Sequence, residues 1–515
     1  METRHTRSIV AAMAAAVISI ASPSRATEGA PLSVIDWLSD SVTLPEAVPA
    51  PAVFPPATLP DDIAVLPLGT PVPDRAGLIA ARDYGLPSGL WGRSSASDLA
   101  RAITNLPEGD AAPPALRRFL RDLLVLRLDP PIDAMVDDSL YLARIDRLLA
   151  MGHLSAAQSL IDGAGVPEPR RFRRAFDIAL LTSEETEACR VIEETPDISP
   201  TYPARIFCLA RLGQWDVAAL TLGNAEALGI LTPEEDKLML HFLDAELFEN
   251  EPVPPAPRLP SPLIFRLYEA VGERLQTDQL PVAYAVADLN DTVGWKSRLR
   301  SAERLAATDA LGYAALLRIY NERKPSASGG VWERVRSHQG LARALDAADT
   351  GRVAQYLSMA WAAASEAGYS AGFADWVAPK LADFDLNGSA GHLAFEIALL
   401  AGLPDIAERF SAQTREDRFL LALKNGQGGS VVGAGTLDRA VLRGLSALGP
   451  GATFQALIDD GRQGEALLRA LEQLLDGAAG NPHATANSLA LLRSLGLENL
   501  ARQIAVELVL MEGAA

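Results

Sequence analysis

Apolar residues follow a helical period along this chain from about residue 75 to its C-terminus. Spacings of three or four residues place such side chains on one face of an amphipathic helix. One series is Tyr141, Leu142, Ile145, Leu148 and Leu149, and another is Leu497, Leu500, Ile504 and Leu508. Runs of β-branched and aromatic residues with a period of two are scarce, apart from residues 63–68. The pattern therefore predicts an all-α fold.

Prolines divide the chain into regions. Nine prolines lie between Ser41 and Asp74, and six lie between Asn250 and Pro262. Because proline lacks a backbone donor and favours extended geometry, neither stretch is expected to be helical. We expect a tether over 27–74, an N-terminal helical arm over 75–249, a linker over 250–262 and a C-terminal helical arm over 263–515.

The N-terminus has the pattern of a secretory signal. Arg4 and Arg7 precede a 15-residue apolar run, Ser8 to Ser22, and small residues follow at Ser24 and Ala26. The run is shorter than the roughly 20 residues that a spanning helix needs, which disfavours the alternative of a retained anchor. No later stretch of 18 residues lacks a charge. We predict a signal peptide over 1–26, export by the general secretory route, and a periplasmic protein without a stable membrane span.

The charge of the mature chain limits its partners. Without residues 1–26 the chain has 43 basic and 64 acidic residues, a net charge of −21. Such a balance disfavours nucleic acid and anionic lipid as principal partners. We therefore expect protein partners.

One short amphipathic segment, Leu32–Asp40, precedes the prolines. Val34, Trp37 and Leu38 share one face if this segment is helical. Two interpretations remain open: the segment packs on its own protein, or it docks in the groove of a partner.

Helical segments of 12–18 residues joined by short turns suggest a repeat. The turn positions Gly152, Ser183 and Gly213 are 31 and 30 residues apart. Five residues after each turn position comes an alanine, and four residues after that a larger apolar residue. A second alanine follows after the two glycine turns only. The sets are Ala157, Ile161 and Ala164 after Gly152; Ala188 and Ile192 after Ser183; and Ala218, Leu222 and Ala225 after Gly213.

Over residues 140–230 this arrangement resembles the tetratricopeptide-like helical repeats, in which a glycine closes the turn and small residues let paired helices approach. The resemblance implies an α-solenoid of stacked antiparallel helix pairs. It also implies a concave surface that holds other proteins.

The segment Gly368–Gly372 matches the Gly-x-Ser-x-Gly motif of serine hydrolases, with Ser370 as the nucleophile. That motif requires a strand ahead of the serine. Residues 359–367 instead consist mainly of residues with high helix propensity. A glycine-rich turn between two helices therefore explains the motif equally well. A hydrolase centred on Ser370 is the alternative function.

A second alternative is calcium binding. Asp383, Asp385 and Asn387 have the alternate spacing of a calcium loop that ends in Gly388. Ala394 occupies the position where such a loop needs a bidentate glutamate. The competing interpretation is a turn in which Asn387-Gly388 ends one helix and Ser389 caps the next.

The other motif searches predict no cofactor and no metal. Residues 431–436 contain glycines as in a dinucleotide loop, but we predict an ordinary loop with Thr436 as a helix cap. The six histidines are scattered without zinc-ligand spacing. The basic cluster Arg170–Arg174 predicts a solvated helix face, or a surface for an acidic partner.

Cys189 and Cys208 are the only cysteines. An even count in an exported chain suggests a disulfide. The two lie at equal distances from the middle of a proline-containing turn, so antiparallel helices would place them at equal heights. We predict a Cys189–Cys208 bond, with two buried free thiols as the alternative.

These inferences predict an interaction scaffold without chemistry of its own. Exported repeat proteins commonly support envelope assemblies of the secretion, wall-synthesis or flagellar type, so we expect envelope proteins as partners.

Overall fold

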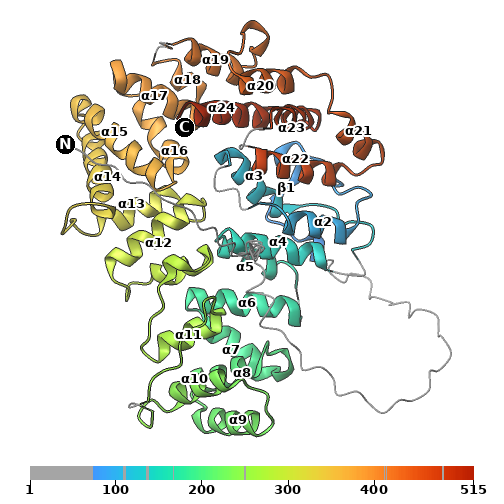
Figure 1. The fold of residues 1–515 in the computed structure, drawn as a ribbon, viewed down its shortest axis with the longest axis vertical. Helices are drawn as coiled ribbons and strands as arrows, with labels where there is room; N and C mark the ends of the chain where they lie inside the picture. Colours follow the sequence, from blue (N-terminus) through green and yellow to red (C-terminus); the bar gives the residue numbers. More distant parts are fainter. Residues whose placement is uncertain are drawn as a thin grey trace, which may run out of the picture. The chain divides into compact units, whose positions relative to one another are not determined.

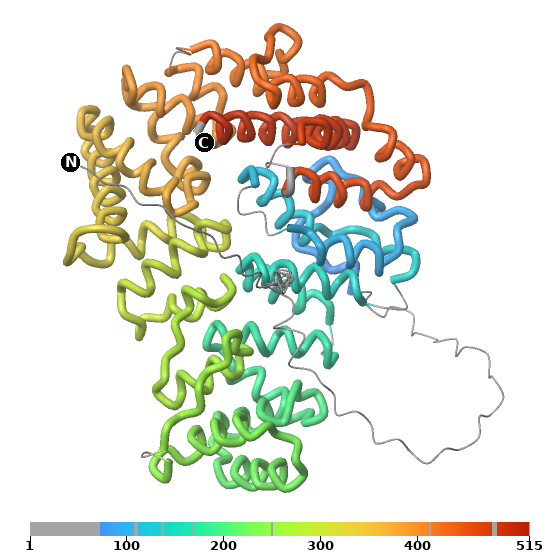
Figure 2. Tube along the Cα trace, viewed as in Figure 1, coloured from blue at the N-terminus to red at the C-terminus, as the bar shows by residue number. Residues whose placement is uncertain are grey.

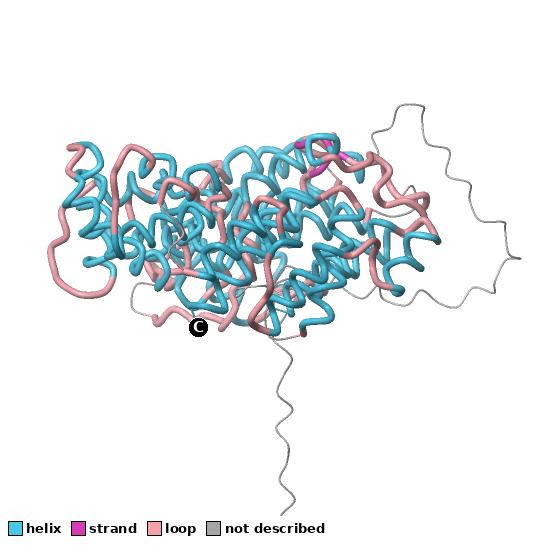
Figure 3. The backbone as a smooth tube through the Cα atoms, turned by 90° about the horizontal axis from the view of Figure 1, so that it is seen from above, coloured by secondary structure: helices cyan, strands magenta, loops and turns pink. Residues whose placement is uncertain are grey.

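The computed structural model describes residues 73–107, 112–134, 138–165, 168–248, 251–410, 412, 414–477 and 481–514, which fall in one compact unit. The predicted signal peptide, residues 27–72 of the predicted tether, and Val34, Trp37 and Leu38 lie outside these ranges. The described part is built almost entirely of helices (Figure 3), which confirms the all-α prediction. None of these helices has the combination of length and apolar composition needed to cross a bilayer.

The first ten described α-helices are short and follow one another closely. They are α2 (Ala96–Thr104), α3 (Pro114–Leu124), α4 (Ser139–Ala150), α5 (Leu154–Asp162), α6 (Pro169–Thr182), α7 (Glu185–Glu194), α8 (Tyr202–Arg211), α9 (Trp215–Ala227), α10 (Pro233–Leu243) and α11 (Pro262–Ala270). Short 3-10 helices lie before, among and after them: η1 (Pro73–Arg75), η2 (Ala81–Tyr84), η3 (Pro196–Ile198), η4 (Thr277–Gln279) and η5 (Val282–Leu289). Residues 251–261 form no helix, as their prolines predict.

The remaining helices include the longest ones. They are α12 (Trp295–Ala307), α13 (Tyr313–Asn321), α14 (Val331–Asp346), α15 (Thr350–Glu366), α16 (Ser370–Leu381), α17 (Gly388–Leu400), α18 (Pro404–Ala407), α19 (Arg415–Lys424), η6 (Gly428–Ser430), α20 (Thr436–Ser446), α21 (Ala452–Asp459), α22 (Gln463–Gly477), α23 (Pro482–Ser494) and α24 (Glu498–Ala514).

Local sequence explains where many helices begin. Ser95, Thr232 and Thr414 each accept a hydrogen bond from the backbone N–H three residues later. Such caps satisfy donors that a helix N-terminus leaves unpaired. Proline occupies the first turn of several others, including α6 and α11, where its missing donor costs nothing.

The predicted turns between helices adopt the backbone geometry that glycine favours. Gly152, Ser183 and Gly213 have φ values of 81°, 64° and 83°. This left-handed conformation is the usual end of a helix. Ala157 and Ala218, five residues after the glycines, have no exposed surface, and their small size lets α4 pack on α5 and α8 on α9.

A buried arginine holds the first described residues in place. The strands β1 (Ile79–Ala80) and β2 (Leu126–Arg127) pair in parallel, and Arg144 of α4 lies beneath them, 1 % exposed. Its guanidinium donates to the carbonyl oxygens of Asp74, Ala76, Leu124 and Leu126 over 2.7–3.1 Å. Burial lowers the pKa of Arg144 to about 10, which leaves it charged at neutral pH.

The C-terminal helices return to the N-terminal ones. α22 packs on α2, and α24 packs on α3; Figures 1 and 2 show these red and blue segments side by side. Glu507 of α24 accepts a hydrogen bond of 2.8 Å from the backbone N–H of Ala115, at the start of α3. Burial raises the pKa of Glu507 to about 7.

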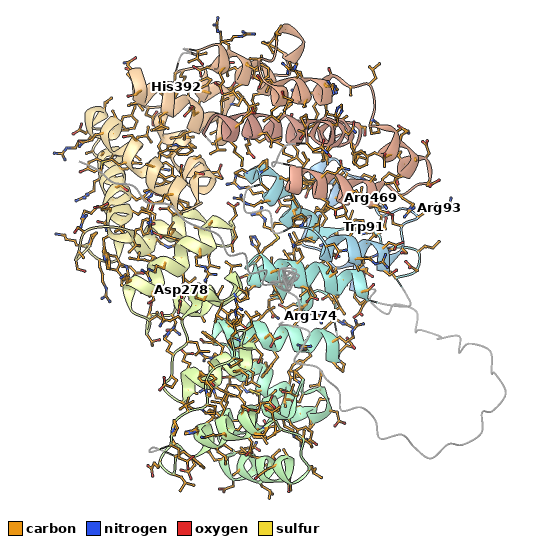
Figure 4. The ribbon with its side chains drawn as sticks, viewed as in Figure 1. Trp91, Arg93, Arg174, Asp278, His392 and Arg469 are labelled. Carbon is orange, nitrogen blue, oxygen red and sulfur yellow. A yellow bond between two sulfur atoms is a disulfide. The ribbon has the colours of Figure 1, made fainter. Side chains whose placement is uncertain are left out.

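A second contact joins the loop after η2 to the turn before α22. The N–H of Arg93 donates to the carbonyl oxygen of Gly461 over 2.9 Å, the side chain of Arg93 lies against Gly461, and that of Trp91 lies against Gly464 of α22; Trp91 and Arg93 are labelled in Figure 4. Trp91 is 1 % exposed. A Cβ atom at Gly464 would approach Trp91 Cε3 to 2.4 Å, so only glycine fits there.

We expect Gly464→Ala to lower the free energy of unfolding by about 1–3 kcal/mol, because the added methyl must displace a buried ring. Urea unfolding measures the change. Gly223→Ala in α9 is the control, since a Cβ there meets nothing within 4 Å; it should be neutral or stabilise by about 0.5–1 kcal/mol. Equal stability of the two variants would contradict the close packing at Gly464.

The hydrophobic interior consists of two main clusters and a small one. The largest cluster combines residues 81–181 with residues 265–509. A second cluster belongs to α6–α11 and includes Phe176, Phe207, Leu222 and Met239. The α6–α11 region therefore has an interior of its own.

The predicted disulfide is present. Cys189 of α7 and Cys208 of α8 are bonded, with their Cα atoms 4.8 Å apart, and both are buried in the second cluster. The short helix η3 and the prolines of the connection lie between the two helices. The bond joins equal levels of an antiparallel pair, as the sequence symmetry predicts.

Candidate functional site

Ser370 lies in helical surroundings. It is the first residue of α16, and α15 precedes it where a hydrolase would have a strand. Gly368, with φ of 80°, makes the turn between the two helices. Among the hydrogen bonds of the described residues, none joins Ser370 to a histidine. The motif thus has the structure of a helix–helix turn.

The residues proposed for calcium lie in an exposed turn. Asp383, Asp385 and Asn387 are all exposed, and no group of three or more acidic, histidine or cysteine side chains in the described ranges is arranged to hold a metal ion. The predicted cap at Ser389 is wrong: Asn387 is the N-cap residue of α17, and Ser389 lies in its first turn. Gly388, with φ of 61°, allows this start.

Residues 431–435 form a loop, as predicted, but the cap of the helix that follows differs. Thr436 is the first residue of α20, and Gly435 is the N-cap residue. The carboxylate of Asp438 accepts from the N–H groups of Ala434 and Gly435 over 2.8 and 2.9 Å. The prediction of Thr436 as the cap is wrong because the helix begins one residue earlier than expected, so that Thr436 already lies inside it and Gly435 takes the N-cap position.

The arginines at 170–174 are engaged within the protein. Arg170 pairs with Asp138 over 2.8 Å, and Arg174 donates to Asp146 over 2.6 Å. Asp177, one turn later, is buried, and burial raises its pKa to about 7. The cluster joins α6 to α4 and its N-terminus, which leaves little of its charge for an acidic partner.

One histidine, His392, has two acidic neighbours that the sequence did not lead us to predict. His392 Nε2 lies 3.4 Å from Glu396, four residues later on α17, and its Nδ1 lies 3.5 Å from Asp417. The two carboxylates approach opposite ring nitrogens, so the three groups do not converge on one point. His392 is labelled in Figure 4.

Helix α9 presents apolar side chains to solvent, and they form one candidate site. Val217, Leu220 and Leu228 are 47, 67 and 71 % exposed, and with Asn224 they follow a spacing of three, four and four residues along one face. Tyr202 of α8, 41 % exposed, lies beside them, and a shallow hollow of about 470 Å³ separates it from Leu228. We call Tyr202, Val217, Leu220 and Leu228 the α9 surface.

The region around the α9 surface is strongly acidic. Residues 184–251 contain 15 acidic and 4 basic residues, a net charge of −11 in a chain whose total is −19. Exposed apolar patches with a polar rim mark interaction sites. The α9 surface thus combines an apolar centre with an acidic stretch of the chain, while the charged side chain that lines the hollow itself is that of Arg205.

A second candidate site is a cavity of about 860 Å³ among α3, α4, α12, α14 and the turn after α15. Its polar lining comprises five arginines and three carboxylates: Arg117, Arg147, Arg300, Arg304, Arg334, Asp278, Glu303 and Glu366. Asp278 belongs to η4 and is labelled in Figure 4. We call this space the arginine cavity.

A buried hydrogen-bond network lies behind the wall of the arginine cavity. The carboxylate of Glu303 accepts from Tyr320 over 2.7 Å, Tyr320 bonds Tyr369 over 2.8 Å, and the two nitrogens of His338 bond Tyr369 and Tyr313. Burial and the charge of Arg334 lower the pKa of His338 to about 3. The imidazole is neutral at physiological pH, and the network ties α12 through α16 together.

No protein-family model, no curated protein and no solved structure matches this chain. The function of this chain therefore has to be inferred from its own residues.

Proposed function

We propose that the protein is an exported scaffold that binds other envelope proteins and has no chemistry of its own. The exposed α9 surface is the observation that carries this proposal. Burying these four side chains, which are 41–71 % exposed in the isolated chain, would contribute to binding in proportion to the apolar area removed from water.

The surroundings of the α9 surface specify the partner's chemistry. Because residues 184–251 have a net charge of −11, an acidic partner would be repelled and a basic one attracted. We propose a protein partner with an apolar centre and a basic rim. The shallow form of the hollow beside Tyr202 suits the face of a folded protein or a helix.

The helical architecture supports the same role. The left-handed turns at Gly152, Ser183 and Gly213 and the buried Ala157 and Ala218 fit a solenoid of tetratricopeptide-like helix pairs, which we propose for residues 140–230. Such solenoids use exposed helix faces to bind proteins. The disulfide suits an oxidising compartment such as the periplasm. We retain Val34, Trp37 and Leu38 as a proposed second docking element.

The test is in-cell cross-linking with a matched pair of variants. Leu220→Asp places a charge on the α9 surface, whereas Leu448→Asp changes another exposed leucine, which lies in the loop before α21. We expect Leu220→Asp to reduce recovery of the cross-linked partner about tenfold, as loss of a central contact does. Leu448→Asp should leave recovery unchanged.

Both variants should melt at the wild-type temperature, since neither leucine is buried. Recovery of the partner by Leu220→Asp at the wild-type level would remove the α9 surface from the proposal. Recovery of the monomer alone from wild-type envelopes would contradict the scaffold function itself.

A further inference from the structure

The arginine cavity has an excess of positive charge in an acidic protein. One of its five arginines is neutralised: Arg334 donates to both oxygens of Glu303 over 2.9 and 2.6 Å. Glu366, at 3.7 Å from Arg334, has a side chain that is 72 % exposed. Three further arginines of the lining, Arg117, Arg300 and Arg304, thus face Asp278 and the largely solvated Glu366.

Two of these arginines donate hydrogen bonds to uncharged backbone carbonyl oxygens. Arg304 donates to the carbonyl oxygens of Thr277 and Leu280, and Arg117 donates to those of Ala112 and Ala307. Within the described ranges neither guanidinium lies in an ion pair. Carbonyl oxygens hold a guanidinium in a fixed position without cancelling its charge.

A third arginine, Arg300 of α12, is exposed and has no hydrogen bond or ion pair among the described residues. It lies one turn from Arg304 on the same helix and lines the same cavity. Neighbours four residues apart on a helix lie close enough to act on one ligand. The fixed Arg304 and the unpaired Arg300 therefore form a positively charged wall.

The rest of the lining is largely apolar. Leu120, Met151, Leu280, Val282 and Leu475 contribute side chains from four different segments. A pocket with apolar walls and a few placed charges is the usual form of a small-molecule site. Its volume of about 860 Å³ falls in the range of such sites.

We propose that the arginine cavity binds a small amphipathic anion, with a carboxylate or phosphate group against Arg300 and Arg304 and a short hydrocarbon part against the apolar wall. Guanidinium groups match both kinds of oxyanion because they donate paired hydrogen bonds. This proposal is independent of the scaffold function, since the cavity and the α9 surface share no residue.

Calorimetric titration of the full mature chain with three probes tests this. Octanoate and octyl phosphate share a hydrocarbon chain with the neutral 1-octanol, so the comparison isolates the charge. We expect at least one anion to bind about tenfold tighter than 1-octanol at 0.15 M salt. The tighter of the two anions identifies the preferred head group.

A charge-reversed pair of variants locates the site. Arg300→Glu should weaken binding of the preferred anion about tenfold and leave the binding of 1-octanol unchanged. Arg352→Glu, an equal charge reversal at the exposed start of α15 and outside the cavity lining, should change affinity far less, because 14 helical residues, about 20 Å, separate it from Glu366 at the cavity and salt screens its charge. Equal binding of all three probes, or equal effects of the two variants, would overturn the proposal.

Discussion

Replacing Arg144 with methionine is expected to lower the free energy of unfolding by about 3–5 kcal/mol, the usual cost of removing one partner from a buried charged network. The four carbonyl oxygens that the guanidinium joins would lose their donor in a site that water does not reach. Methionine has a similar length, so the loss comes from hydrogen bonds more than from packing. Urea unfolding followed by circular dichroism measures the difference.

Two further variants separate charge from geometry. Arg144→Lys keeps the charge but has a single nitrogen, which cannot reach acceptors on four residues, so we expect an intermediate loss. Arg343→Met is the matched control, because Arg343 also donates to a backbone carbonyl, at Gln339, but is exposed; it should change stability by less than about 0.5 kcal/mol. A loss at Arg144 no larger than at Arg343 would show that the buried network contributes nothing.

Removing the disulfide is expected to cost about 3 kcal/mol, since the bond closes a short loop and restricts the unfolded chain. The residues are 19 apart in sequence. We expect a reductant to shift urea unfolding of the wild type, and the double variant Cys189→Ala, Cys208→Ala to be insensitive to it. A peptide map without reductant should recover the two cysteines in one linked pair.

The position of this bond makes the prediction more specific. Cys189 and Cys208 belong to the cluster formed by α6–α11, so the shift should appear first in probes of that region, such as the fluorescence of Trp215. Free thiols in periplasmic material, or no response of the wild type to reductant, would contradict the prediction.

Local features of the fold were predictable because their causes are local. Gly152 and Gly213 end helices because a left-handed residue suits glycine, and the spacing of the apolar residues beside them defines each helix. The equal distances of Cys189 and Cys208 from their turn are likewise visible in the sequence. Ser183 shows the limit of such rules, because a serine holds the same conformation without glycine's freedom.

Long-range features were not predictable, because their causes lie far away in the sequence. Nothing near Glu507 indicates that its carboxylate accepts from Ala115, 392 residues away. In the sequence, Arg144 looks like any other arginine of a helix. Only the packing of β1 and β2 over it shows that it donates to buried carbonyl oxygens.

Of the candidate sites, the stripe of Val217, Leu220 and Leu228 is visible in the sequence. The opposite stripe of α9, formed by Ala218, Leu222 and Ala225, is equally visible in the sequence. Only the fold shows that this second stripe is the buried one. The arginine cavity draws its lining from seven separate segments, so no local pattern signals it.

The return of α22–α24 to α2 and α3 has a consequence for how the chain reaches its native state. Arg93 and Gly461 are 368 residues apart, and at about 5–20 residues per second a ribosome needs roughly 20–70 s to make that stretch. Until then, the apolar faces of α2 and α3 that α22 and α24 cover stay open to solvent and to other chains. The first helices made, which pack early only on α4, are thus among the last to be fully covered.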